Sequence, residues 1–334
     1  MTETKKFKAM IVSEKKDKFI RRIGERSIGD LPEGEVLINV KYSSLNYKDA
    51  LSASGNKGVT RSYPHTPGID AAGIVEESVN SDFKKGDEVI VTGFELGSNI
   101  PGGFGQYIRV PADWIVKLPA GLSLKEAMAY GTAGFTAGLS LAKLEEKGLT
   151  TEGGDILVTG ATGGVGSLSV AVLNKAGYPV TASTGKIERE DFLKNIGAKK
   201  IIPRKEVDDT SNRALLPARW GGAIDSVGGN ILTTVIKSTK LNCSVAACGL
   251  TQSPNITTTV YPFILRGVSL LGIDSAHCPM DIRRRIWNKL AAEWKPDNLN
   301  IIYSECSLYD LSEKIDLILK GQLTGRVVVN LDTE

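Results

Sequence analysis

The sequence predicts an α/β protein in which a doubly wound parallel sheet is joined to a β-rich domain. Short β-rich runs separated by Gly, Pro and Asp fill residues 1–126, and strand-like and helix-like segments alternate after them. With 334 residues, the chain is long enough for about two domains. We therefore expect a first domain over 1–126, a second over 127–273, and a return to the first over 274–334.

The β-rich part is punctuated by turn residues at short intervals, which is typical of a barrel or sandwich. The one segment here with a helical pattern is 46–54, which begins at Asn46. The predicted strands are 8–12, 35–44, 68–78, 87–93 and 105–119.

The second part begins with a long segment of helical period at 124–148. Strands and helices then alternate, which predicts parallel strands joined by crossover helices. A late amphipathic helix is predicted at 279–294, and the tail at 321–331 returns to β character and is expected to rejoin the first domain. The predicted strands are 155–160, 179–184, 200–204, 222–227, 243–249 and 267–273, with helices at 164–177 and 188–197.

Charge and cysteine content exclude several classes of protein. The chain has 41 Lys and Arg residues and 38 Asp and Glu residues, so its net charge is nearly balanced. The basic runs at 5–8 and 283–285 are interpreted as solvated, and no nucleic-acid partner is expected. Four cysteines without a C-x-x-C pair do not form a disulfide scaffold. The N-terminal residues lack the apolar stretch of a signal peptide, and no membrane span is visible. We expect a cytoplasmic protein.

The stretch DILVTGATGGVG at 155–166 has the form of a phosphate-binding turn between a strand and a helix. Ala161, Gly163 and Gly166 have the spacing of the dinucleotide motif, with Ala in the first place, and Gly160 and Gly164 are interpreted as giving the turn extra freedom. Bare backbone there lets a pyrophosphate approach the free N–H groups of the helix N-terminus.

The choice of dinucleotide depends on the end of the next strand. An NAD site usually places Asp or Glu about 20 residues after the glycines. The window 181–187 contains no acid but contains Ser183, Thr184 and Lys186, and Arg204 follows the third strand. Hydroxyls and cations suit a ribose 2′-phosphate, so the sequence predicts NADPH rather than NADH.

The order of these motifs resembles the medium-chain dehydrogenase/reductase superfamily. SSLNYKDAL (43–51), PGIDAAGIV (67–75), ILVTGATGGVGS (156–167), GAIDSVGG (222–229), VAACGL (245–250) and PFILRGVSLLGIDS (262–275) together resemble its branch of acryloyl-CoA reductases, which also holds proteins labelled quinone oxidoreductases. The resemblance implies a GroES-like catalytic domain, a Rossmann domain that binds NADP, and a homodimer that pairs near 256–273.

A catalytic zinc, which many members of that superfamily carry, is not expected. Such a site needs three protein ligands, yet the chain has only His65 and His277 and no cysteine before Cys243. Gly68-Ile69-Asp70 stands where the zinc enzymes carry Gly-His-Glu. The remaining chemistry is addition of hydride to a carbon already activated by conjugation, which an enoyl-CoA and a quinone both offer.

Tyr47 and Asn46 are the predicted catalytic residues, because the resemblance places NYKD beside the nicotinamide. A phenol can donate to an enolate oxygen or deliver a proton. The alternative is that Tyr47 only contacts the cofactor. Asn46 fits a helix N-cap, and Asp49 could complete a capping box.

The remaining cofactor contacts are predicted around the loop and at later strand ends. The full set is Tyr47, Thr162, Gly163, Gly164, Val165, Thr184, Gly185, Lys186, Arg204, Leu250, Ile264 and Ser275. Arg326 is interpreted as either a phosphate contact or an ordinary surface residue. The predicted activity is NADPH-dependent reduction of a short enoyl-CoA such as acryloyl-CoA, with a quinone reductase or a non-catalytic NADPH-binding protein as alternatives.

Overall fold

The structure, a computed structural model, describes residues 5–16 and 18–332. Contacts divide the chain into two compact units: unit 1 is Met1–Thr132, Ala276–Arg284 and Tyr303–Glu334, and unit 2 is Ala133–Ser275 and Arg285–Ile302. The predicted domains 1–126, 127–273 and 274–334 remain a proposal for the functional division. The units differ from them mainly at 285–302, where Trp287 stacks on Phe135 at 6.2 Å between ring centroids.

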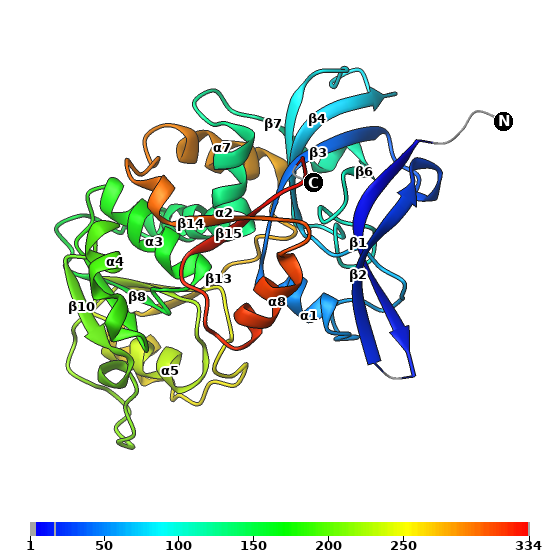
Figure 1. The fold of residues 1–334 in the computed structure, drawn as a ribbon. Helices are drawn as coiled ribbons and strands as arrows, with labels where there is room; N and C mark the ends of the chain where they lie inside the picture. Colours follow the sequence, from blue (N-terminus) through cyan, green and yellow to red (C-terminus); the bar gives the residue numbers. More distant parts are fainter. Residues whose placement is uncertain (1–4, 17, 333–334) are drawn as a thin grey trace. The chain divides into compact units, whose positions relative to one another are not determined.

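Unit 1 contains a seven-stranded sheet (Figure 1). Its order is β14-β15-β3-β4-β5-β7, and β6 pairs with β3. Apolar side chains such as Val40, Val91 and Val329 form the core of the unit. The strands are β3 (Val36–Ser44), β4 (Asp70–Ser78), β5 (Glu88–Thr92), β6 (Tyr107–Val110), β7 (Ile115–Lys117), β14 (Tyr303–Ser307) and β15 (Arg326–Asn330).

The C-terminal tail completes this sheet, as predicted. β15 pairs antiparallel with β3, with Val329 opposite Ser43, and parallel with β14. The pairing brings Arg326, at the start of β15, close to the end of β3. The helices α1 (Tyr47–Ala53) and α8 (Leu311–Leu319) also belong to unit 1.

A two-stranded hairpin, β1 (Lys6–Lys15) and β2 (Lys18–Ser27), lies outside the seven-stranded sheet and is drawn in dark blue in Figure 1. The strand β2 was not predicted. Its sequence KFIRRIGERS is highly charged, and no residue in it is fully buried. Without a buried face, the strand shows little of the alternation on which a prediction depends.

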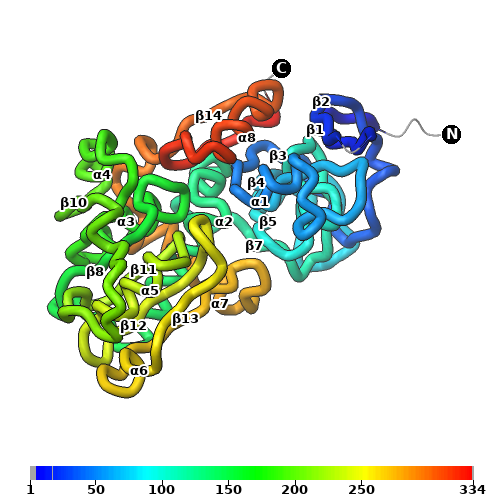
Figure 2. The backbone as a smooth tube through the Cα atoms, turned by 90° about the horizontal axis from the view of Figure 1, so that it is seen from below, coloured from blue at the N-terminus to red at the C-terminus, as the bar shows by residue number. Residues whose placement is uncertain are grey.

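Unit 2 contains six parallel strands in the order β10-β9-β8-β11-β12-β13 (Figure 2). Numbered along the chain, this is the 3-2-1-4-5-6 order of a dinucleotide-binding fold, and it confirms the predicted doubly wound sheet. The strands are β8 (Ile156–Thr159), β9 (Val180–Thr184), β10 (Lys200–Pro203), β11 (Gly222–Asp225), β12 (Ser244–Ala247) and β13 (Ser269–Gly272). The helices between them are α3 (Gly164–Lys175), α4 (Glu190–Asn195), α5 (Gly229–Ser238) and α6 (Tyr261–Arg266).

The long helix α2 (Leu124–Glu146) is interrupted, although the sequence predicts one continuous helix over 124–148. Gly131 has φ 50° and ψ −154°, which no helical residue adopts, and unit 2 begins at Ala133. A side chain at Gly131 would lie 2.4 Å from both Asp70 Oδ2 and Ser44 Oγ. Neither α2 nor any other described helix is long and apolar enough to cross a membrane.

The basic run 283–285 lies on α7 (Met280–Ala291), and the prediction that it is solvated is wrong for Arg283. This side chain is 1% exposed, and its Nη1 donates to the carbonyl of Thr92 at 2.9 Å. Its guanidinium lies 4.6 Å from the ring centroid of Phe94. Arg284 and Arg285 are exposed, as predicted. The guanidinium of Arg283 can be buried because backbone carbonyls from distant segments accept hydrogen bonds from it.

Candidate active site and dinucleotide loop

The turn between β8 and α3 is closed by glycines that have no room for a side chain. Gly160 has φ +60°, and a Cβ there would lie 2.6 Å from Ser226 Oγ. A Cβ at Gly166 would lie 2.2 Å from the carbonyl oxygen of Gly160. Gly160 was interpreted as extra slack, but the structure requires glycine there for both conformation and space.

The N-terminus of α3 presents its backbone to solvent. Gly163 is the N-cap with φ −79° and ψ 177°, and no side chain caps the helix. Gly163 is exposed and Gly164 and Val165 are half-buried. The hydroxyl of Thr162 lies 3.2 Å from that of Thr184 at the end of β9. Uncapped N–H groups and the helix dipole favour an anion at this position.

Cations gather where β9 and β10 end. The parallel pairing of these strands sets Pro203 opposite Thr184, so Arg204 and Gly185 follow at the same edge. Burial lowers the pKa of the Lys186 ammonium, and the positive charges of Arg189 and Arg204 lower it further, against the opposing effect of Glu188. The edge therefore carries positive potential, as the prediction of a 2′-phosphate site requires.

The other predicted cofactor residues lie in two places. Leu250 and Ser275 follow the ends of β12 and β13, at the same edge of the sheet as the β8–α3 turn. Ile264 lies elsewhere, on α6, which precedes β13, and its side chain is 68% exposed. The sequence did not single out Asp225, which is buried and accepts hydrogen bonds from Thr159 Oγ1 at 2.6 Å and Gly228 N at 2.7 Å.

Tyr47 is the first residue of α1 and is 45% exposed, while its neighbours on this corner are buried. The Oδ2 atom of Asp49 accepts the backbone N–H of Asn46 at 2.8 Å, which is the capping contact that was predicted. The other carboxylate oxygen of Asp49 accepts the N–H of Ile69 at 2.8 Å. Burial, followed by the charge of Asp70, raises the pKa of Asp49 to about 7.

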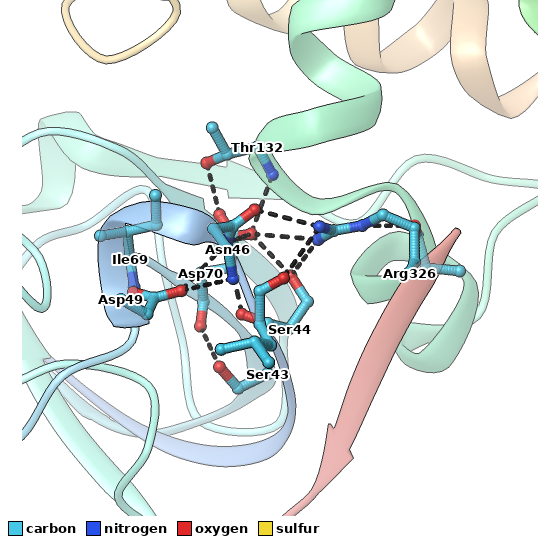
Figure 3. Close-up of polar contacts among 10 residues, drawn as sticks. Ser43, Ser44, Asn46, Asp49, Ile69, Asp70, Thr132 and Arg326 are labelled. Atoms are coloured by element: carbon cyan, nitrogen blue, oxygen red, sulfur yellow. Dashed lines mark hydrogen bonds and ion pairs between the residues drawn. The ribbon is translucent and has the colours of Figure 1, made fainter. Parts of the chain in front are cut away.

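A buried ion pair between Arg326 and Asp70 supports this corner (Figure 3). Their Nη2 and Oδ2 atoms are 3.8 Å apart, and the two side chains are 3% and 0% exposed. Arg326 also donates to Leu45 O at 2.9 Å and to Asn46 Oδ1 at 3.2 Å. The interpretation of Arg326 as an ordinary surface residue is therefore wrong.

Asp70 collects donors from three segments of unit 1. Its Oδ2 accepts from Ser44 Oγ at 2.6 Å and from Asn46 Nδ2 at 2.7 Å. Thr132 donates its backbone N–H to Oδ2 at 2.9 Å and its hydroxyl to Oδ1 at 2.5 Å. The side chains of Asn46, Asp70 and Arg326 point toward one another in Figure 3. Nothing in the sequence signals this network, because its members are far apart along the chain.

The donor set of unit 1 does not fit a zinc ion. No three His, Cys, Asp or Glu side chains among residues 5–16 and 18–332 are arranged to share a metal. His65 is buried, and its Nε2 lies 2.9 Å from the carbonyl oxygen of Gly97. The two carboxylates at the Tyr47 corner already face the cationic Arg326, which would repel a metal ion.

Cys248 does not have the properties of a nucleophile. Its Sγ donates to the carbonyl of Asp225 at 3.2 Å. Burial and the nearby Asp225 raise the pKa of the thiol to about 12, so the reactive thiolate is not populated near neutral pH.

Two family models match the chain. The Alcohol dehydrogenase GroES-like domain matches residues 32–120, and the Zinc-binding dehydrogenase family matches residues 164–292. The second description includes zinc, but the described residues provide no ligand set for it.

Several full-length relatives are similar to this chain. The "Putative quinone oxidoreductase YhfP" of Bacillus subtilis is 48% identical, covering 97% of this chain and 99% of the relative. Acrylyl-CoA reductase AcuI of Ruegeria pomeroyi is 45% identical, and the match covers 98% of this chain and 99% of that relative. Among solved structures, B. subtilis yhfP with NAD bound superposes with a TM-score of 0.96, covering 98% of this chain and 100% of that one at 48% identity. The yhdH oxidoreductase of Salmonella enterica in complex with NADP superposes with a TM-score of 0.95. That match covers 97% of this chain and 100% of that one at 40% identity.

Proposed function

Because this chain belongs to the medium-chain dehydrogenase/reductase superfamily, in the branch that holds AcuI and YhfP, we propose that it is an NADPH-dependent oxidoreductase. Its proposed substrate is the activated C=C bond of a short enoyl-CoA such as acryloyl-CoA. The observation that carries this proposal is the full-length similarity to acrylyl-CoA reductases.

The β8–α3 turn and the cationic edge beside it fit NADPH. Uncapped N–H groups at Gly164 and Val165 suit the pyrophosphate, and Gly163 lets it approach the backbone closely. Thr184, Gly185, Lys186 and Arg204 suit the 2′-phosphate, because β9 ends without a carboxylate. When bound, NADPH supplies the hydride. One relative was solved with NAD and another with NADP, so the preference rests on Lys186 and Arg204 of this chain. The further proposed cofactor contacts are Tyr47, Thr162, Leu250, Ile264 and Ser275.

Tyr47 and Asn46 are the proposed catalytic residues. The half-exposed phenol of Tyr47 can donate a hydrogen bond to the thioester oxygen as negative charge develops there, or a proton to the α-carbon. Asn46, which precedes Tyr47, is buried and held by Arg326 and Asp70, so its proposed role is to fix the start of α1 and with it the position of Tyr47. No metal-dependent step is included, because the donor set does not fit one.

Quinone reduction is the second candidate activity. It is favoured by the name of the relative that is 48% identical. It would use the same cofactor loop and also needs no metal, so the geometry of the individual units does not separate the two substrates.

We also propose a cytoplasmic homodimer. β13 ends the six-stranded sheet and has only β12 as a neighbour, so its outer edge can pair with a second copy. The segment before it exposes five large apolar side chains, Ile256, Val260, Tyr261, Ile264 and Leu265, by 40% to 68%. None of the four cysteines forms a disulfide, which suits a reducing compartment.

The test is a parallel assay of NADPH oxidation with acryloyl-CoA, crotonyl-CoA and 1,4-benzoquinone. We expect the highest kcat/KM with acryloyl-CoA. A higher value with the quinone would favour the second candidate. Tight NADPH binding without turnover of any of the three substrates would contradict both activities.

A further inference from the structure

We propose that Arg326 and Asp70 are positioning residues for Tyr47: together they hold the corner between β3 and α1 from which this side chain emerges. The inference rests on the proposed function, because it requires Tyr47 to act on the substrate. It concerns residues of unit 1 alone.

Arg326 contacts the three residues that immediately precede the tyrosine. It donates from Nη2 to Ser44 Oγ at 2.8 Å, and from Nη1 to Leu45 O at 2.9 Å and Asn46 Oδ1 at 3.2 Å. A planar guanidinium offers these donors in a fixed fork, so three consecutive residues are held in one geometry. Tyr47 follows directly and begins α1.

Asp70 holds the same corner from β4. Its Oδ2 accepts hydrogen bonds from Ser44 Oγ and Asn46 Nδ2. The side chains of Ser44 and Asn46 are therefore each hydrogen-bonded to both Asp70 and Arg326. The Asn46 amide is therefore fixed in orientation: its oxygen faces Arg326 and its nitrogen faces Asp70. A helix of seven residues is too short to be rigid by itself, and these contacts determine where its first residue lies.

The same pair also fixes the interruption of α2. Thr132 binds both oxygens of Asp70, and Arg326 Nε donates to the carbonyl of Ala129 at 3.3 Å. Gly131 between them leaves no space for a side chain against Asp70 and Ser44. The corner is thus tied to a second backbone segment, which limits how far it can move when one contact is lost.

A role in stability alone does not account for this arrangement. Buried ion pairs contribute little net stability, because desolvation of the charges offsets their attraction. In some proteins a buried polar or ionic group instead selects one geometry among several. The contacts on Ser44, Leu45 and Asn46 indicate that the selected geometry is that of the Tyr47 corner.

A double-mutant cycle tests this inference on the full-length enzyme with NADPH and acryloyl-CoA. We expect Arg326→Met to lower kcat about 100-fold, as misplacement of a reacting group does, while the Kd of NADPH changes by less than about threefold. In a Tyr47→Phe background, the same substitution should lower kcat by less than about threefold, because the positioned group is already absent. Arg326→Lys should remain slow, since an ammonium cannot reproduce the fork.

Arg283→Met is the matched control. Arg283 is an equally buried arginine of unit 1, and it binds Thr92 and Ala276. Its effect on kcat should be the same in both backgrounds. Ser44→Ala removes a contact of both Arg326 and Asp70, and it provides a milder cycle if Arg326→Met does not fold.

Two different results would overturn the inference, and they can be distinguished by the activity of the Tyr47→Phe variant. If Tyr47→Phe is slow and the loss from Arg326→Met or Ser44→Ala is equally large in both backgrounds, the positioning role is wrong and the proposed function stands. If Tyr47→Phe is as fast as the unmodified enzyme, the catalytic role of Tyr47 fails, and the positioning role fails with it.

Discussion

A side chain at Gly185 would collide with Arg204: its Cβ would lie 2.7 Å from Nη2 and 2.9 Å from Cζ of the guanidinium. The arginine therefore lies directly over the backbone that follows β9. Lys186 comes next, and burial lowers the pKa of its ammonium, with the positive charges of Arg189 and Arg204 acting in the same direction. Two cations, Lys186 and Arg204, therefore follow the ends of β9 and β10, and a bound anion would relieve their mutual repulsion.

Lys186→Glu should weaken NADPH binding about 10–100-fold relative to NADH, because one charge-assisted contact is replaced by repulsion. Fluorescence titration with both dinucleotides measures the ratio of the two Kd values. Lys199→Glu makes the same charge change just before β10 and serves as the control. An unchanged ratio in Lys186→Glu would show that the 2′-phosphate assignment is wrong.

Gly166→Ala should destabilise unit 2 by about 1–3 kcal/mol, because the added methyl would lie 2.2 Å from Gly160 O and the backbone must move. NADPH affinity should fall with it. Gly163→Ala is the comparison, since its methyl would meet only Gly160 O at 3.3 Å. Urea unfolding of both variants measures the difference. Equal destabilisation would indicate that close packing of the turn is not the reason for glycine at 166.

Tyr47→Phe should lower kcat about 100-fold or more with the enoyl-CoA, because the hydroxyl that stabilises negative charge or delivers the proton is removed. The Kd of NADPH should stay the same. Stopped-flow oxidation of NADPH together with equilibrium binding separates these effects. A loss of NADPH affinity at unchanged kcat would instead make Tyr47 a cofactor contact.

The free energy of unfolding should fall as pH rises between about 4 and 7, by up to ~1.4 kcal/mol per pH unit from Asp49. In this window the folded state retains the Asp49 proton, because its pKa is about 7, while the unfolded chain has already lost it. Asp49→Asn should therefore flatten the slope, as urea unfolding at several pH values would detect.

Asp310→Asn is the control for this pH dependence. Hydrogen bonds from Ser307 lower the pKa of Asp310, so its removal should act in the opposite direction and at lower pH. An Asp49→Asn slope identical to that of the unmodified protein would show that this carboxyl is ionised throughout the range.

Ile264→Lys combined with Leu265→Lys should convert the proposed dimer to a monomer at micromolar concentration, because both apolar side chains, 68% and 58% exposed, would be charged and repelled at an interface. Sedimentation velocity measures the change. Val79→Lys alters an apolar residue of unit 1 that is even more exposed, at 88%, and should leave the mass unchanged. A double variant that remains dimeric would place the interface elsewhere.

The elements that the sequence predicted are those with local signals. The β8–α3 turn was predicted because glycine spacing and a following apolar helix are contiguous in the chain. The helix α5 was missed, since GNILTTVIKS is rich in β-branched residues that disfavour an isolated helix. Burial of Ile231, Val235 and Ile236 against the sheet overrides that preference.

The sequence by itself determined the fold class, the dinucleotide turn and the lack of zinc ligands, because each depends on residue type and spacing within short segments. Only the tertiary structure decided what the charged residues do. Arg326 contacts Asn46, 280 positions away, and Arg283 contacts Thr92, 191 positions away. Whether a charge is solvated or buried depends on partners that the fold brings together, and no local pattern records them.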